Sequence, residues 1–88
     1  MRDSRFTLAP GSQVREEDFG LLFYTMAGPR LYFLSSGDWI GSDFFQGVVS
    51  LEQCLRQHTG PESVTDRLME QMTAGLNHLK EKGVILEY

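Results

Sequence analysis

Two short apolar runs that lie close together constrain the fold more than any other feature of the sequence. The runs Gly20–Tyr24 and Leu31–Leu34 are rich in aromatic and aliphatic residues, and Gly28-Pro29 lies between them. Glycine tolerates positive φ and proline fixes φ, so this pair marks a turn. Two β-prone runs joined by a turn predict an antiparallel hairpin.

The predicted hairpin is apolar on both faces. Side chains alternate between the two faces of a strand, so Leu21 and Phe23 point one way while Leu22 and Tyr24 point the other. A sheet with one wet face normally alternates apolar and polar residues. We therefore expect the N-terminal segment and the helices to cover both faces. Alternatively, Leu31–Leu34 is an exposed edge strand, whose unpaired backbone groups can accept an added strand.

Length and composition predict one domain spanning residues 1–88 with a modest core. The formal net charge is −4, which argues against nucleic acid or an anionic membrane as a partner, because surfaces that bind these carry clustered lysine and arginine. Cys54 is the single cysteine, so an internal disulfide is excluded. There is no signal-peptide pattern and no apolar run near the ~20 residues of a membrane span. We expect a cytoplasmic protein.

Further elements are predicted around the hairpin. Residues 1–5 are expected to fray, short strands are expected at Phe6–Leu8, Gln13–Glu16 and Val84–Leu86, and three strands suffice for the sheet. Three helices are expected after the hairpin: Trp39–Phe45, then a helix starting at Ser50, then Glu62–Lys82.

The starts and ends of these helices carry recognisable signals. Ser50 and Gln53 form a capping-box pattern, Pro61 suits a first helical turn, and Gly83 is a natural stop. Together the elements predict the α+β class, with an N-terminal three-stranded antiparallel sheet followed by three helices. A tight turn between the last two helices is typical of a winged helix-turn-helix.

No cluster of side chains suggests catalysis. His58 and His78 lie on different predicted helices without a second ligand nearby, and Cys54 lacks a polarising histidine. We therefore expect no enzyme activity, no metal and no cofactor. The last helix of a winged-helix protein usually reads DNA, but residues 61–82 hold four acidic and three basic residues. Such a helix has too little positive charge to face phosphates.

Three segments carry a family resemblance: VREEDFGLLFY, GPRLYFLSSGDWI and LKEKGVI. The sequence resembles the RiPP recognition elements, which are PqqD-like winged-helix chaperones of ribosomally made peptide pathways. Within that family it is most similar to the precursor-binding (MftB-like) chaperones of mycofactocin biosynthesis. The resemblance covers roughly residues 6–86, and each segment is mainly a hydrophobic pattern with turns.

The resemblance implies a non-catalytic chaperone that binds the leader of a short precursor peptide and presents it to a radical S-adenosylmethionine (radical SAM) maturase. The leader would add as an antiparallel strand to the last strand of the sheet and lie against the third helix. The peptide-binding residues implied in this way are Arg30, Leu31, Tyr32, Phe33, Leu34, Arg67, Leu68, Met69, Met72 and Leu76. Arg30 and Arg67 would pair with acidic leader residues, and methionines suit an adaptable surface, although they are also common in cores.

Two other functions stay open. A winged-helix transcriptional regulator or another protein-interaction module would be favoured by a basic patch that brings Arg2, Arg5, Arg15 and Arg30 together. A small peptide-modifying enzyme would be favoured by a pocket that joins His78 and Cys54 to a carboxylate. An exposed edge strand also allows a homodimer by self-pairing.

Overall fold

The computed structural model describes residues 4–26 and 30–87 and belongs to the α+β class, as the sequence predicts. In chain order its elements are β1 (Phe6–Leu8), β2 (Ser12–Glu17), β3 (Gly20–Thr25), β4 (Arg30–Leu34), the 3-10 helix η1 (Ser42–Phe45), α1 (Leu51–Thr59), the 3-10 helix η2 (Pro61–Ser63), α2 (Asp66–Glu81) and β5 (Ile85–Glu87). The predicted turn at Gly28-Pro29 lies outside the described residues.

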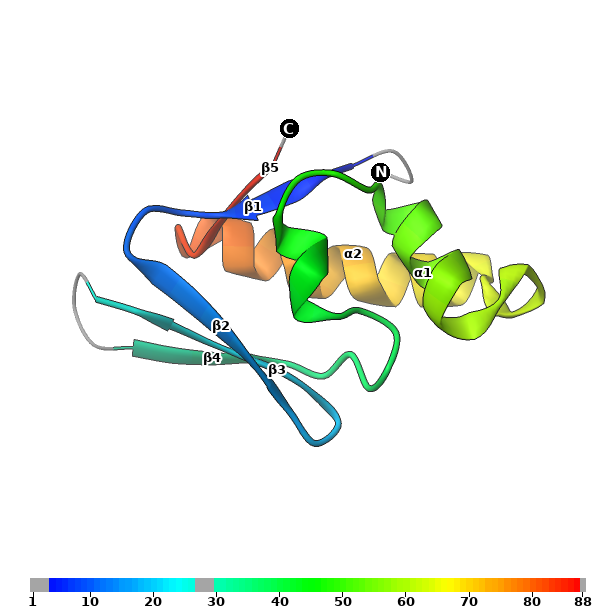
Figure 1. Ribbon diagram of the computed structural model, residues 1–88, viewed down its shortest axis with the longest axis horizontal. Helices are drawn as coiled ribbons and strands as arrows, with labels where there is room; N and C mark the ends of the chain where they lie inside the picture. The colour runs from blue at the N-terminus through cyan, green and yellow to red at the C-terminus, as the bar shows by residue number, and fades with distance from the viewer. Residues whose placement is uncertain (1–3, 27–29, 88) are drawn as a thin grey trace.

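The strands form two separate sheets (Figure 1). The predicted three-stranded antiparallel sheet is confirmed and has the order β2-β3-β4, with Phe23 opposite Val14 on one side and Tyr32 on the other. The strand β1 does not join this sheet but pairs antiparallel with β5, with Thr7 opposite Leu86. The strands predicted at Phe6–Leu8 and Val84–Leu86 therefore both exist, the second one residue later than predicted, and they pair with each other.

The described residues contain two α-helices, so the prediction of three is not confirmed. The expected helix over Trp39–Phe45 is reduced to η1, because Gly41 is extended, with φ −94° and ψ 166°. The Ser50–Gln53 capping box at the start of α1 is confirmed, because each side chain accepts a hydrogen bond from the backbone N–H of the other residue. The last helix begins four residues later than predicted, where Thr65 Oγ1 accepts a hydrogen bond from the Leu68 N–H at 3.1 Å.

The core forms where α2 packs on the inner face of the three-stranded sheet. In Figure 1, α2 passes between that sheet and the β1–β5 pair. Phe23 and Leu21 point inward from β3 and are at most 1% exposed. The buried residues of α2 are Leu68, Met69, Met72, Leu76 and Leu79. This apolar stripe follows the helical spacing of three and four, so one face of the helix is committed to the core.

The outer face of the three-stranded sheet is open, contrary to the expectation that both faces are covered. Leu31 and Phe33 point to this face and are 68% and 52% exposed. Leu22 and Tyr24 of β3 share the face and are half-buried. The helices pack on the other face, and β1 pairs with β5, so neither is placed to cover it.

The two ends of the chain meet around Glu87. Ser4 Oγ donates to Glu87 Oε2 at 2.6 Å, and Lys80 Nζ of α2 lies 2.7 Å from Glu87 Oε1. Both bonds lower the pKa of Glu87, and the bond from Lys80 has the larger effect. Ser4 also accepts a bond from the Leu51 N–H at its carbonyl oxygen, at 2.9 Å. The expectation that residues 1–5 fray is therefore wrong at Ser4, and residues 1–3 lie outside the described part.

Candidate functional site

The strand β4 is an edge of the three-stranded sheet. It pairs with β3, and no described strand pairs with its other side. The opposite edge, β2, is partly covered, because the N–H and Oγ of Ser42 both donate to Glu16 Oε2, at 3.1 and 2.8 Å. Unpaired N–H and C=O groups along an edge are a template for another strand. The more accessible template in this fold is thus β4.

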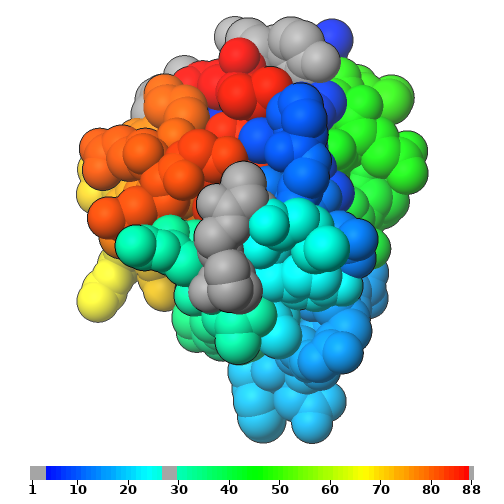
Figure 2. Space-filling view, turned by 90° about the vertical axis from the view of Figure 1, so that its left-hand side faces the viewer, coloured from blue at the N-terminus to red at the C-terminus, as the bar shows by residue number. Residues whose placement is uncertain are grey.

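Side chains of β4 alternate between open surface and α2. Tyr32 is half-buried, and its ring centroid lies 6.4 Å from that of His78 in an edge-on arrangement. Leu34 is buried against Gly75, where an added Cβ would lie only 2.5 Å from the Leu34 Cδ1 atom. Figure 2 shows the start of β4, in blue-green, beside the C-terminal turns of α2, in orange. Because residue numbers rise along β4 as they fall along α2, the two elements run antiparallel.

Most of the predicted binding residues of α2 lie in the core. Met69, Met72 and Leu76 are at most 5% exposed and belong to the main hydrophobic cluster, so they do not line an open groove. The helical stripe that suggested them is the same stripe that folds the domain. Next to β4, the residues that flank the strand are Gly75 and His78. Neither is among the predicted binding residues, although their spacing of three places them on one helical face beside the stripe.

Two of the predicted residues do line a pocket. Arg67 is exposed and Leu68 is 9% exposed, and both border a hollow at the N-terminal end of α2. Its full lining is Trp39, Thr59, Ser63, Thr65, Arg67, Leu68 and Gln71. Gln71 is one helical turn from Gly75, against which the end of β4 packs. The pocket therefore continues the flank of α2 beyond the end of β4 and offers an apolar floor beside a cationic rim.

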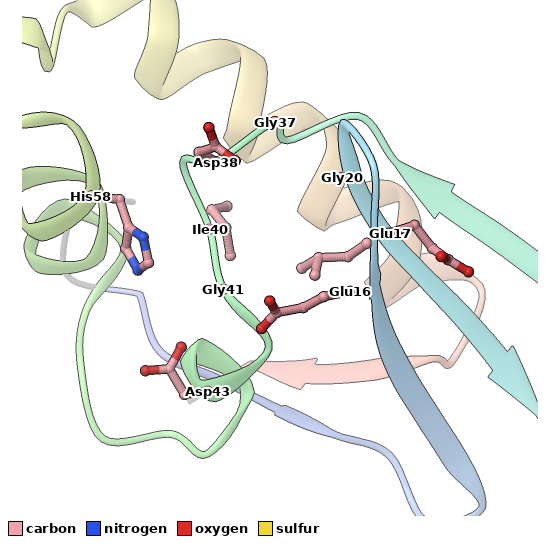
Figure 3. Close-up of a pocket in the computed structure, with 10 residues that line it drawn as sticks. Glu16, Glu17, Gly20, Gly37, Asp38, Ile40, Gly41, Asp43 and His58 are labelled. Atoms are coloured by element: carbon pink, nitrogen blue, oxygen red, sulfur yellow. The ribbon is translucent and has the colours of Figure 1, made fainter.

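A second pocket is acidic. Its lining includes Glu16, Glu17, Asp38, Asp43 and His58. Figure 3 shows Glu16 reaching from β2 toward the backbone at Gly41, whereas Glu17 points away. The hydrogen bond from the Ser42 side chain, and after it the one from the Ser42 backbone, lower the pKa of Glu16. The link between β2 and η1 is therefore fully present above the ordinary carboxyl pKa and weakens as the pH falls through the lowered value.

The two residues named for a peptide-modifying enzyme have different neighbours, and the basic patch named for a regulator lies partly outside the described residues. His78 lies against Tyr32, whereas the Cys54 Sγ atom is 3.8 Å from the Trp39 carbonyl oxygen, so the pocket proposed for a peptide-modifying enzyme is not formed by these two residues. Arg15 donates from Nε to Glu17 Oε1 at 2.9 Å, and Arg2 lies outside the described residues. Among the described side chains, no three histidine, cysteine or acidic residues are arranged to hold a metal ion.

Cys54 is expected to react very slowly with thiol reagents. It is 2% exposed, and burial raises its pKa to about 11. Because the thiolate is the reactive form, a rise of two or more pKa units over a free cysteine lowers the reactive fraction at pH 8 roughly 100-fold or more. Reaction with 5,5′-dithiobis(2-nitrobenzoic acid) should be slow in the native protein and fast in guanidinium chloride. Equal rates in both conditions would contradict this burial.

No helix within residues 4–26 and 30–87 has the length and apolar character needed to cross a membrane. No protein-family model matches the chain, and neither a curated protein nor a solved structure matches it.

Proposed function

We propose that this protein is a peptide-binding chaperone that captures the leader of a ribosomally made precursor peptide as an added strand on β4. The observation that carries the proposal is the edge position of β4 beside the flank of α2. Backbone hydrogen bonds along Arg30–Leu34 would supply affinity with little demand on sequence, and alternate side chains of the peptide would meet α2.

The pocket at Arg67 and Leu68 supports a defined direction for the bound peptide. A strand that runs antiparallel to β4 places its N-terminal part beyond Leu34, toward that pocket. An apolar peptide side chain there would contact Trp39 and Leu68, and an acidic neighbour would pair with Arg67. The exposed Arg30 offers a second cation at the other end of β4.

In its finer details the proposed fold is a winged helix-turn-helix. We assign α1 and α2 as its last two helices, with η1 as a shortened first helix and the β3–β4 hairpin as the wing. In α2, Asp66, Glu70 and Glu81 outnumber Arg67 and Lys80, which disfavours contact with phosphates. The geometry therefore supports a peptide partner for this fold better than DNA.

In this role the chaperone does no chemistry. It would hold the precursor near a radical SAM maturase and raise the effective concentration of the peptide at that enzyme. The iron–sulfur cluster of such an enzyme belongs to the partner, since this chain carries a single, buried cysteine.

An NMR titration with the precursor peptide encoded beside this gene tests the proposal. Saturable amide shifts are expected along Leu31–Leu34 and at Gly75 and His78, with none when duplex DNA is added instead. Arg67→Glu should weaken peptide binding about 10-fold at low salt, because a charge-assisted contact becomes a repulsion. Arg56→Glu, on α1 beside Glu52, is the matched control and should bind normally. An absence of shifts with folded protein would overturn the proposal.

A further inference from the structure

The backbone groups that β4 leaves unpaired can be identified from the hydrogen bonds of its neighbours. The Met26 N–H, one residue past the end of β3, donates to the Gly11 carbonyl oxygen at 2.9 Å. In an antiparallel ladder, alternate residues direct their N–H and C=O groups to opposite sides. Even-numbered residues of β3 therefore bond to β2, and odd-numbered ones bond to β4. Since these odd-numbered residues pair with even-numbered residues of β4, Leu31 and Phe33 direct their backbone groups to the open edge.

The side chains of the same two residues are apolar and open. Leu31 and Phe33 are both exposed on the outer face of the sheet. Natural edge strands are usually protected against pairing by a proline, a charge or a bulge. The run Leu31–Leu34 contains no proline and no charged residue. The middle of β4 is thus an unprotected edge with two bonding positions, one on each side of Tyr32.

This edge is complementary to itself. If β4 strands from two copies pair antiparallel with the two-fold axis at Tyr32, Leu31 lies opposite Phe33 of the second copy, and the reverse contact forms on the other side of the axis. All the free N–H and C=O groups then bond across the interface. A leucine also lies beside a phenylalanine twice on the outer face, which is a favourable cross-strand contact. A shift of two residues in either direction would leave one bonding position opposite a residue outside β4.

Charge does not oppose this register. Arg30 is the only charged residue of β4, and the pairing places it opposite Leu34 of the second copy. The two Arg30 residues are then about 14 Å apart along the strands, at ~3.4 Å per residue, which exceeds the screening length of roughly 8 Å at physiological salt. Each whole copy carries a net charge of −4, so added salt should strengthen the pairing.

The size of the interface limits its strength. A strand of five residues is about 17 Å long, and pairing along one edge covers far less than the ~800 Å² per partner of a standard interface. We therefore expect a dissociation constant on the order of 100 µM and rapid exchange. A peptide that uses the same edge and also reaches the pocket at Arg67 and Leu68 makes more contacts, so it should displace the second copy.

We propose that two copies of this chain pair weakly through β4, antiparallel and centred on Tyr32, and that a bound peptide displaces the second copy. The pairing needs only the open edge, whereas the displacement rests on the proposed chaperone function. The contact is isologous, because the same strand is used by both copies. It therefore closes at two copies and does not continue into a fibre.

Cysteine variants of the full-length protein test the register. Tyr32 lies on the axis, in a pair without hydrogen bonds whose Cα atoms are about 4.5 Å apart, so Tyr32→Cys should oxidise to a disulfide-linked dimer. Phe33→Cys alone is the control, because two such cysteines lie diagonally, about 8 Å apart, which is too far for a disulfide. Mixed with Leu31→Cys, however, it should form a linked heterodimer. The native Cys54 is buried. Equal crosslinking of Tyr32→Cys and Phe33→Cys alone would overturn the register.

Sedimentation velocity over a concentration series measures the pairing without crosslinks. The parent should show a monomer–dimer equilibrium that strengthens with salt. Leu31→Lys should weaken it about 10-fold or more, because a lysine at the edge lies opposite an apolar ring. Val48→Lys is the matched control, since Leu31 and Val48 are each 68% exposed and Val48 lies outside β4. A parent that stays monomeric at about 1 mM, or a Leu31→Lys variant that dimerises like the parent, would overturn the pairing.

Addition of the precursor peptide separates this proposal from the chaperone function. Peptide binding accompanied by loss of the dimer supports both. A peptide that does not bind overturns the chaperone function and the displacement, while the crosslinks still decide the pairing. A peptide that binds while the dimer persists overturns the displacement and shows that the peptide does not occupy β4.

Discussion

Replacing Gly20 with alanine should lower the free energy of unfolding by about 2–3 kcal/mol, which is the upper part of the range for overpacked sites. A Cβ at this position would lie 2.1 Å from the carbonyl oxygen of Leu34 and 2.8 Å from Cζ of Phe33. The first of these atoms is backbone, so the strain cannot be relieved by a side-chain rotation. The strand β4 would have to move away from β3. Thermal unfolding followed by circular dichroism should show a melting temperature lower by roughly 8–24 °C.

Gly75→Ala is the matched control for this effect. Its Cβ would also be too close to an atom, at 2.5 Å, but that atom is Cδ1 at the tip of the flexible Leu34 side chain. Alanine in a helix interior also gains about 1 kcal/mol over glycine in helix propensity. We therefore expect a change in stability close to zero. If both variants lost the same stability, the close approach of the two strands at Gly20 would not be the cause.

The elements that depend on local signals could be predicted from the sequence. The apolar runs of the hairpin became β3 and β4 within one residue at each end, and the Ser50–Gln53 pattern became a complete capping box. Such signals act between neighbours in the chain, so they survive whatever the rest of the fold does. The pairing of β1 with β5 had no such signal. Each strand has three residues, which is too short to specify a partner about 80 residues away.

The candidate site was predictable on the strand but not on the helix. An edge strand follows from the order of a short sheet, so Arg30–Leu34 could be proposed from the sequence. On α2, apolar spacing identifies the face that is buried, and the same pattern cannot say which flank meets β4. That depends on the close contact between Leu34 and Gly75, which is a tertiary feature. Glycine at position 75 interrupts a helical stripe, and this was the available signal.

The open outer face differs from the prediction that both faces of the hairpin are covered. Hydrophobic residues on both faces of the hairpin were expected to be buried, because burial of apolar surface stabilises the fold. The chain has only two α-helices in its described part, and the stripes of both are used in one core. No further α-helix within residues 4–26 and 30–87 is left to cover the second face. The excess of apolar residues in the hairpin is therefore a surface property, and it is informative about partners.

Phe45→Ala should be the most destabilising of the substitutions considered, with a loss of about 3–5 kcal/mol. Phe45 is 4% exposed, and its ring meets Phe23 and Phe44 edge-on, each with 5.1 Å between centroids. Phe44 in turn lies 5.8 Å from Phe6. These four rings form a chain from β3 through η1 to β1, so they join the three-stranded sheet to the β1–β5 pair. The predicted helix over Trp39–Phe45 is absent, yet its aromatic residues still serve the core.

Chemical denaturation of Phe45→Ala and of Phe19→Ala separates the effect of burial on stability from the effect of losing an aromatic ring. Both variants remove one phenylalanine ring, but the ring of Phe19 is exposed, so its loss should change stability by no more than about 0.5 kcal/mol. Breaking the aromatic chain should also weaken the coupling between the two sheets. We expect the parent to unfold in one transition and Phe45→Ala to lose hydrogen-exchange protection in β1 and β5 before β3. Equal stability of the two variants would contradict the role of burial, and uniform loss of protection would mean that the aromatic chain does not couple the two sheets.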